Sequence, residues 1–306
     1  MDLSIIVCTH NRAQLLLQTL ESLRAVAWET GLEAEILVVA NACSDRTTEM
    51  LASLAVQWPA EALALRWLEE PRAGKSFALN SAIQATHSSM LCFIDDDQIV
   101  TRDYLLALAD VMTREPCFGI YCGWMHPAWD GSEPPWVHVR GEYMIPVRPF
   151  PEYDLGEREM EVVAGMKNPS GGNIAVRREV FAAIDGFSTK LGPVGHNLMG
   201  GEDAEFIDRA RAAGIRILYS PRMRQYHLLE HERMKTLYMM KKSYLRSYSS
   251  VSVREHEGIA LSILRKLLSH LWHILSSLDG RRRFYWLMRF AATMGELRGQ
   301  FQPKRN

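Results

Sequence analysis

The sequence predicts an α/β protein with a Rossmann-like, mostly parallel sheet and flanking helices, followed by a helical C-terminal extension. Apolar runs typical of strands alternate with helical patterns four times within the first 95 residues, as expected where helices connect parallel strands. Beyond residue 228 the pattern is helical throughout. Because the carboxyl ends of parallel strands meet at one edge of a sheet, the functional residues are expected along that edge.

Each expected strand is a short β-type run followed by a polar loop and a helix. Strands are expected at residues 3–8, 35–39, 63–68, 90–94, 174–176 and 215–219. Helices are expected after Asn11, through residues 50–54, after residues 74–76, from about Thr101, and from Glu202 to Gly214. Residues 121–155 are rich in tryptophan, tyrosine and proline and are predicted to form a long loop.

Three consecutive acids, Asp95, Asp96 and Asp97, come directly after the fourth strand. Carboxylates packed this closely repel one another unless a cation neutralises them, and oxygen ligands suit Mg²⁺ or Mn²⁺. Such a cation commonly holds a diphosphate, which points to a nucleotide-dependent transferase. The alternative is a solvated acidic turn that caps the next helix.

Two common nucleotide-binding motifs are absent. A Walker loop ending at Lys75 needs a glycine where Glu69 stands, and no G-x-G-x-x-G sequence follows the first strand. The sequence therefore argues against both of those protein classes.

The long loop carries aromatic residues, among them Trp124 and Trp136, that can form a wall for a sugar acceptor or pack the loop onto the sheet. Paired glycines precede Asn173 and allow a backbone to approach a ligand closely. The acids Glu202 and Asp203 begin a helix, where they favour its dipole or act in chemistry.

The charge is distributed unevenly along the chain. Residues 222–306 carry 17 basic and 6 acidic residues, a net charge of +11, whereas the whole chain has a net charge of -1. The acidic main part argues against nucleic acid as a partner, and the basic end can meet an anionic membrane surface. Residues 259–278 form an amphipathic pattern, with Leu264, Leu268 and Leu275 on its apolar face, that suits core packing, a protein partner or lipid.

Five cysteines, an odd number, lie mostly in strand-like runs and are expected to be reduced. The chain opens on a strand-like run without a leader sequence, so a cytoplasmic location is expected, with peripheral contact to the inner face of the membrane.

Taken in order, the motifs resemble those of an inverting family 2 nucleotide-sugar glycosyltransferase with the GT-A fold. They are Val7-Cys8-Thr9-His10-Asn11-Arg12, Val38-Val39-Ala40-Asn41-Ala42-Cys43-Ser44-Asp45, Gly74-Lys75, Asp95-Asp96-Asp97, Gly172-Asn173 and Gly201-Glu202-Asp203. The resemblance spans residues 3–227. It implies a hexosyltransferase-type enzyme in envelope or exopolysaccharide biosynthesis, which moves one sugar from a nucleotide-sugar donor, a UDP-sugar by preference, to a saccharide or lipid-linked acceptor.

The resemblance also implies roles for individual residues. The donor nucleotide would be bound by Thr9, Asn11, Arg12, Asn41, Lys75, Asp95 and Asp96. The family's usual base-binding aspartate is replaced by Ala40, so either Asn41 substitutes for it or the base preference differs. The DxD acids Asp95 and Asp97, with His227, would bind Mn²⁺ or Mg²⁺ to offset charge on the departing diphosphate.

On the acceptor side, the resemblance implies that Asp203 is the base that takes the proton of the acceptor hydroxyl and that Glu202 orients that hydroxyl. The acceptor would contact Trp124, Trp136, Gly172 and Asn173. The Q-x-x-R-W motif of processive synthases is absent, which favours single transfer.

The predicted organisation is a glycosyltransferase domain over residues 1–227, with a donor half at 1–120 and an acceptor half at 121–227, and a helical basic extension over 228–306. Three alternatives are weighed: a zinc protease built on His227-Leu228-Leu229-Glu230-His231, a nucleotidyltransferase of similar fold, and a non-catalytic scaffold.

Overall fold

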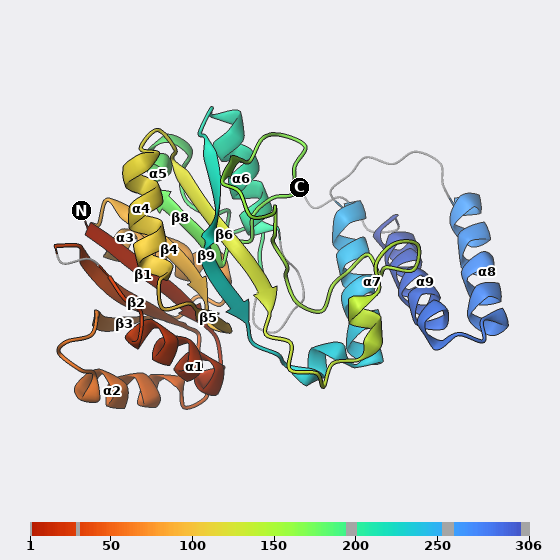
Figure 1. Ribbon diagram of the computed structural model, residues 1–306. Coiled ribbons are helices and arrows are strands. Elements are labelled where there is room, and N and C mark those ends of the chain that lie inside the picture. Colours follow the sequence, from red (N-terminus) through yellow and green to blue (C-terminus); the bar gives the residue numbers. More distant parts are fainter. Residues whose placement is uncertain (1, 29–30, 194–200, 253–259, 301–306) are drawn as a thin grey trace. The chain divides into compact units, whose positions relative to one another are not determined.

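The computed structural model describes residues 2–28, 31–193, 201–252 and 260–300 (Figure 1). Ile259, the first residue of the amphipathic pattern at residues 259–278, lies outside these ranges. Contacts divide the chain into two compact units, one of residues 1–128 and 151–228 and the other of residues 129–150 and 229–306. The first unit ends at Leu228, one residue after the predicted end of the first domain at residue 227. Residues 129–150 group with the C-terminal helices.

The first unit is built on a nine-stranded mixed sheet. Its strands are β1 (Asp2–Thr9), β2 (Glu33–Asn41), β3 (Ala64–Glu70), β4 (Met90–Asp95), β5 (Gln98–Val100), β6 (Ile120–Pro127), β7 (Met160–Glu161), β8 (Asn173–Arg177) and β9 (Ile217–His227). Its helices are α1 (Ala13–Arg24), α2 (Thr47–Gln57), α3 (Lys75–Ala85), α4 (Tyr104–Arg114), α5 (Arg178–Ile184) and α6 (Glu202–Ala212).

The strand order is β3-β2-β1-β4-β8-β6-β9-β5, with β7 beside β9. The strands β3, β2, β1 and β4 are parallel neighbours, as the four predicted repeats require. The strand β8 runs antiparallel to both β4 and β6, and β6 and β9 are parallel. The carboxyl ends of β1 and β4 therefore meet in register, with Cys8 opposite Asp95.

The sheet is covered by helices on both faces, which explains why the central strands β1 and β4 are apolar without alternation. On one face Ile5, Val38 and Cys92 pack against α1, α2 and α4. On the other face Ile6 and Phe93 pack against α3, α5 and α6. Figure 1 shows the two groups of helices on opposite sides of the strands. The mixed sheet with flanking helices is the α/β fold class expected from the sequence.

The prediction of a loop over residues 121–155 is wrong for its first part, because β6 is a central strand of the sheet. The register of β6 shifts between Gly123 and Met125, and the Cα of Gly123 lies so close to the carbonyl oxygen of Met223 that a β-carbon would overlap it. A glycine inside a strand commonly marks such an irregularity, and this one obscured the strand in the sequence. The last strand also runs eight residues further than expected, to His227.

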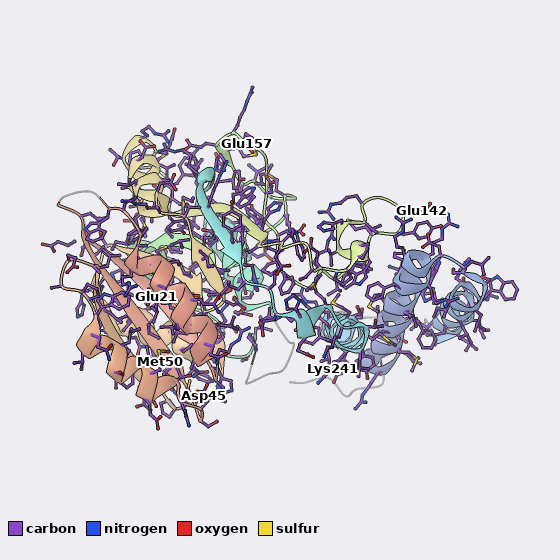
Figure 2. All side chains as sticks on the ribbon, turned by 60° about the horizontal axis from the view of Figure 1, so that its bottom comes forward. Glu21, Asp45, Met50, Glu142, Glu157 and Lys241 are labelled. Atoms are coloured by element: carbon purple, nitrogen blue, oxygen red, sulfur yellow. The ribbon has the colours of Figure 1, made fainter. Side chains whose placement is uncertain are left out.

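The second unit is helical. It contains α7 (Thr236–Ser252), α8 (Ala260–Ser276), α9 (Gly280–Gln300) and the short 3₁₀ helices η1 (Pro135–His138) and η2 (His231–Met234). The helix α9 packs against both α7 and α8. Ile145 of the segment 129–150 joins Met239, Phe284 and Met288 in a small core, and Trp136 stacks on Phe284 with ring centroids 4.4 Å apart. Figure 2 labels Glu142 of this segment and Lys241 of α7.

All five cysteines are free, and Cys92 and Cys122 are buried. In the part of the chain that the structure describes, no helix is long and apolar enough to cross a bilayer.

Candidate active site

The three acids after β4 occupy different environments at the edge of the sheet. Asp96 and Asp97 are buried, and Asp95 is partly exposed. The end of β1 places Thr9 and Arg12 beside them. Oγ1 of Thr9 donates a hydrogen bond to Asp96 at 2.6 Å, and one Arg12 nitrogen donates to Asp96 at 2.7 Å and to Asp97 at 2.9 Å. These two residues, expected to bind the nucleotide, thus hold the acids in place.

Burial raises the pKa of Asp96 to about 6, although the Arg12 guanidinium acts in the opposite direction. A carboxyl group this deeply enclosed by Thr9 and Arg12 serves to anchor the turn. Gln98, which the sequence analysis did not single out, has a similar role: its Oε1 accepts from the backbone N–H of Asp95 at 3.2 Å, and it is fully buried. The sequence signal that could have identified Gln98 is a polar residue directly after the acids, at the start of a buried strand.

Asp97 and His227 come together although they are far apart in the sequence. Nε2 of His227 lies 3.3 Å from Oδ1 of Asp97, and both side chains are buried. Two ladders impose this contact, because Gln98 of β5 pairs with His227 of β9 and the N–H of Leu228 donates to the Asp97 carbonyl at 2.8 Å.

The tautomer of His227 follows from its other nitrogen. Nδ1 lies 2.7 Å from the carbonyl oxygen of Leu228, which only accepts, so Nδ1 carries a proton. Nε2 therefore faces the Asp97 carboxylate in one of two ways. It carries a second proton and donates to the carboxylate, or it is unprotonated and can bind a cation together with the carboxylate. Ligand atoms bound at about 2.1 Å in adjacent octahedral positions are roughly 3 Å apart, so the pair fits a divalent cation.

The predicted third ligand is placed differently. Oδ1 of Asp95 accepts a hydrogen bond from Nζ of Lys75 at 2.6 Å. Among the described residues, no three histidine, cysteine, aspartate or glutamate side chains gather as a complete metal site. A site with few protein ligands is what Mg²⁺ uses when substrate phosphates and water complete its shell.

Lys75 links the acids after β4 to those that begin α6. Besides its bond to Asp95, its Nζ lies 3.9 Å from Oε1 of Glu202. Burial alone would lower the pKa of Lys75, but the charges of Asp95, Asp203 and Glu202 raise it well above its ordinary value. Lys75 is therefore a permanently charged centre among carboxylates.

The adjacent carboxyl groups of Glu202 and Asp203 titrate in opposite directions. Burial and the neighbouring Asp203 raise the pKa of Glu202 to about 7. Burial opposes ionisation of Asp203 as well, but the Lys75 ammonium and the N–H of Gly171, 3.0 Å from Oδ2, hold the pKa of Asp203 below its ordinary value. At neutral pH Asp203 is the ionised member of the pair and Glu202 is the member that can keep a proton.

The paired glycines separate these two groups of acids. A β-carbon on Gly171 would lie 2.8 Å from Oδ2 of Asp203, and one on Gly172 would overlap Oδ2 of Asp95. The sequence predicted that these glycines let the backbone come close to a ligand. In the structure they let the backbone come close to the carboxylates of Asp95 and Asp203. Asp95 and Asp203 therefore flank the same two residues of chain, and any side chain larger than hydrogen would displace them.

Two asparagines expected to bind the nucleotide are used by the fold. The side chain of Asn41 donates to the carbonyls of Glu70 and Arg72 and accepts from the N–H of Gly74 at 2.8 Å, which ties β2 to the loop before α3. Oδ1 of Asn11 accepts from the N–H groups of Ser44 and Asp45. Both Nδ2 hydrogens of Asn41 are thereby used, and its Oδ1 already accepts one hydrogen bond, so only the second lone pair of Oδ1 is left to accept from a nucleobase.

The residues expected at the acceptor belong to both units of the chain. The side chain of Asn173 is buried and hydrogen-bonded to Tyr104, Gln225, Trp124 and Met223, a structural role. Trp124 of β6 stacks on His126 at 4.4 Å in the first unit, whereas Trp136 belongs to the core of the second.

The zinc-protease interpretation is contradicted by local structure. His227 ends β9, whereas His231 begins η2, so the two histidines do not share the helical face that a zinc site of this pattern needs.

Comparison with known proteins finds two protein-family models and two curated relatives that match this chain. The family model described as Glycosyl transferase family 2 matches residues 4–185, more than half of the chain, and one described as N-terminal domain of galactosyltransferase matches residues 154–232. The chain is 25% identical over 253 residues to the glucosyl-dolichyl phosphate glucuronosyltransferase of Haloferax volcanii, covering 81% of this chain and 76% of that protein. It is 24% identical over 222 residues to the succinoglycan biosynthesis protein ExoM of Rhizobium meliloti, covering 72% of this chain and 65% of that protein.

Solved structures show the same fold at low sequence identity. The mannosyltransferase PcManGT from Pyrobaculum calidifontis, in complex with GDP-Man and Mn²⁺, has a TM-score of 0.61 at 15% identity, covering 98% of this chain and 87% of that one. GalNAc-T7 with UDP, GalNAc and Mn²⁺ has a TM-score of 0.56 at 16% identity, covering 86% and 53%. The chain therefore has the GT-A fold, belongs to glycosyl transferase family 2 and is a glycosyltransferase.

Proposed function

We propose that the enzyme transfers a single sugar from a nucleotide-sugar donor to a hydroxyl of a saccharide or lipid-linked acceptor, with inversion at the anomeric carbon and with Mn²⁺ or Mg²⁺ as cofactor. The observation that carries this proposal is the pair of carboxylate groups on either side of Gly171 and Gly172, with Asp95 next to one glycine and Asp203 next to the other. A donor and an acceptor need opposite ends of such a site, because inversion requires attack from the face away from the leaving group.

At the donor end, Asp97 and His227 would hold the divalent cation, and Asp95, two residues before Asp97, is the other acid of the DxD motif. When bound, the cation supplies positive charge to the departing diphosphate. Arg12 binds the second oxygen of Asp97 at 2.9 Å and so turns Oδ1 toward His227. The residues 1–120 form the donor half in this proposal, and residues 121–227 form the acceptor half.

At the acceptor end, Asp203 takes the proton of the attacking hydroxyl. Lys75 keeps this carboxylate ionised, and the N–H of Gly171 fixes one of its oxygens. Among the described residues, buried Oε2 of Glu202 has no hydrogen-bond partner, which suits a group that binds an acceptor hydroxyl. Glu202 thus orients the acceptor while Asp203 acts as the base.

The nucleobase is the least determined part of the donor. Ala40 is apolar and buried and has no side chain that accepts from a uracil N–H, and the amide of Asn41 makes three hydrogen bonds around the loop before α3. UDP-sugars remain the first donors to test, and GDP-sugars belong in the same panel because PcManGT was solved with GDP-Man.

The acceptor class follows from the names of the relatives. One is a glucuronosyltransferase whose name gives glucosyl-dolichyl phosphate, a lipid-linked sugar, and the other is a succinoglycan biosynthesis protein. We accordingly place this enzyme in envelope or exopolysaccharide synthesis, in the cytoplasm and peripherally at the inner face of an anionic membrane.

The proposal is tested by Asp203→Asn, assayed by mass spectrometry of the product from each nucleotide sugar and a panel of lipid-linked and free saccharides. Transfer should fall at least ~100-fold, as expected for loss of a general base, while thermal stabilisation by donor and metal persists. The control is Asp208→Asn, an exposed acid on the same helix. Unchanged transfer by Asp203→Asn would refute the base, and no nucleotide-dependent stabilisation of the folded enzyme would favour the scaffold alternative.

A further inference from the structure

Among the described residues, one face of the helix α8 packs against its neighbours and a second face, which is apolar, is exposed. Its inner face packs on α9: Ile263 and His270 are buried, His273 stacks on Trp286 with ring centroids 4.2 Å apart, and Lys266 pairs with Glu296 at 3.5 Å. This face alone accounts for the place of α8 in the helical unit.

The outer face carries large apolar side chains that are exposed to solvent. They are Leu264, Leu268, Leu271, Trp272 and Leu275, which are 44–74% exposed, and Leu278 just beyond the helix, which is 98% exposed. Their spacing of three and four residues forms one stripe along α8. A contiguous exposed stripe of this kind marks an interaction site, because soluble surfaces rarely leave so many leucines together.

Basic residues border this stripe. Arg265 lies on α8 between two of its leucines, and Arg281, Arg282 and Arg283 begin α9 directly after Leu278, all of them exposed. Within residues 260–283 the acidic residues are outnumbered five to one, with Asp279 as the single acid. A leucine and tryptophan stripe beside arginines is the pattern of a helix that lies in the interface of an anionic bilayer.

The charge of this surface favours lipid over a second copy of the chain as its binding partner. A second copy of the chain would bring the same arginines against these ones and would be repelled, whereas anionic lipid headgroups attract them. We infer that the outer face of α8, with the arginines at the start of α9, docks the enzyme on an anionic lipid surface, with Leu264, Leu268, Leu271 and Leu275 inserted among the acyl chains. This surface deepens the proposed action on a lipid-linked acceptor, and it is carried by an element separate from the catalytic residues.

The test is sedimentation of the full chain with vesicles of phosphatidylcholine alone or with 30% phosphatidylglycerol. Binding should require the anionic lipid and weaken with salt. A variant with Leu264, Leu268, Leu271 and Leu275 all changed to Gln should bind at least tenfold more weakly, and so should one with Arg281, Arg282 and Arg283 changed to Gln. The matched control is Val56→Gln with Leu237→Gln, which are 88% and 79% exposed on other helices.

The outcomes of this experiment either support or overturn the proposed lipid-binding surface. Because the substituted side chains are exposed, the variants should keep the wild-type melting temperature, which is measured first. Equal binding by the leucine variant, or no binding of folded wild-type protein to anionic vesicles, would overturn the inference. Concentration-dependent dimerisation of the wild type that disappears in the leucine variant would overturn it in favour of a second copy. Nucleotide-dependent stabilisation, measured without vesicles, reports on the proposed catalytic function independently and should be the same in every variant.

Discussion

Nζ of Lys75 lies 2.6 Å from Oδ1 of Asp95, and this ion pair connects the acids at the end of β4 with those at the start of α6. The connection has a consequence for catalysis. The same ammonium lowers the pKa of Asp203, so the residue that contacts the donor-side acid also keeps the proposed base ionised. Lys75 was expected to bind the nucleotide, and in the structure it is bonded to the acids.

Replacing Lys75 by Met should therefore change the pH dependence of transfer as well as its rate. Without the ammonium the pKa of Asp203 rises, so the acidic limb of kcat/KM should move to higher pH, and activity at pH 6 should fall more than activity at pH 8. Lys75→Arg should restore most of the profile because it keeps the charge, and Lys190→Met on the surface should leave it unchanged. A Lys75→Met enzyme with the wild-type profile would show that Lys75 does not act on the base.

Glu202→Gln should stabilise the protein at alkaline pH and not at acidic pH. The pKa of Glu202 is raised to about 7 in the folded state, so below the ordinary value near 4.5 both states are protonated and nothing is lost. Between those values the unfolded state ionises first, and folding stability falls by up to about 3 kcal/mol as the pH rises toward 7. Glutamine removes this loss.

The measurement is the melting temperature of Glu202→Gln relative to wild type at pH 5 and pH 8. The difference should be several degrees larger at pH 8. The exposed Glu179→Gln on α5 is the control and should show no such trend. A variant less stable than wild type at pH 8 would mean that Glu202 is ionised in the folded enzyme.

Asn41→Ala should destabilise the fold without changing which nucleotide is preferred. The substitution removes one hydrogen bond from each of the Glu70 and Arg72 carbonyls and the Gly74 N–H, a loss of about 2 kcal/mol, or a melting temperature lower by roughly 5 °C. Melting curves with UDP and GDP should rank the two nucleotides as for wild type, and the exposed Gln57→Ala serves as control. A reversed ranking would show that Asn41 reads the base.

Much of the fold could be predicted because its signals are local. Four buried strands, each followed by a polar loop and a helix, specify the parallel part of the sheet, and the observed strands β1 to β4 lie within two residues of the predicted ends. The strand β6 was missed because Gly123 and its aromatic neighbours hide the alternation, and the continuation of β9 was missed because Pro221 interrupts it. Pairing with distant strands, which single-sequence patterns do not contain, overrides both signals.

The site was predictable as a set of residues but not as a set of contacts. The order of motifs identified Asp97, His227 and Asp203, whereas the use of Thr9, Arg12 and Asn41 inside the protein depends on how β1, β2 and β4 align. Likewise, the leucines of residues 259–278 predicted one apolar face but not what covers it. In the structure the face with Ile263 and His270 is buried, and the leucine face is exposed. The sequence patterns do not show which strands and helices far apart in the chain contact one another, and the contacts of the site depend on this.

The most direct test of the account concerns the pair Asp97 and His227 as the holder of the cation. Thermal stabilisation by UDP and GDP should be measured with Mn²⁺ and with EDTA for the wild type, Asp97→Asn, His227→Gln and, as the matched control, His231→Ala. The account predicts a shift that needs Mn²⁺ in the wild type and in His231→Ala and that is lost in both Asp97→Asn and His227→Gln. A shift of equal size in EDTA, or one retained by both of those variants, would contradict it.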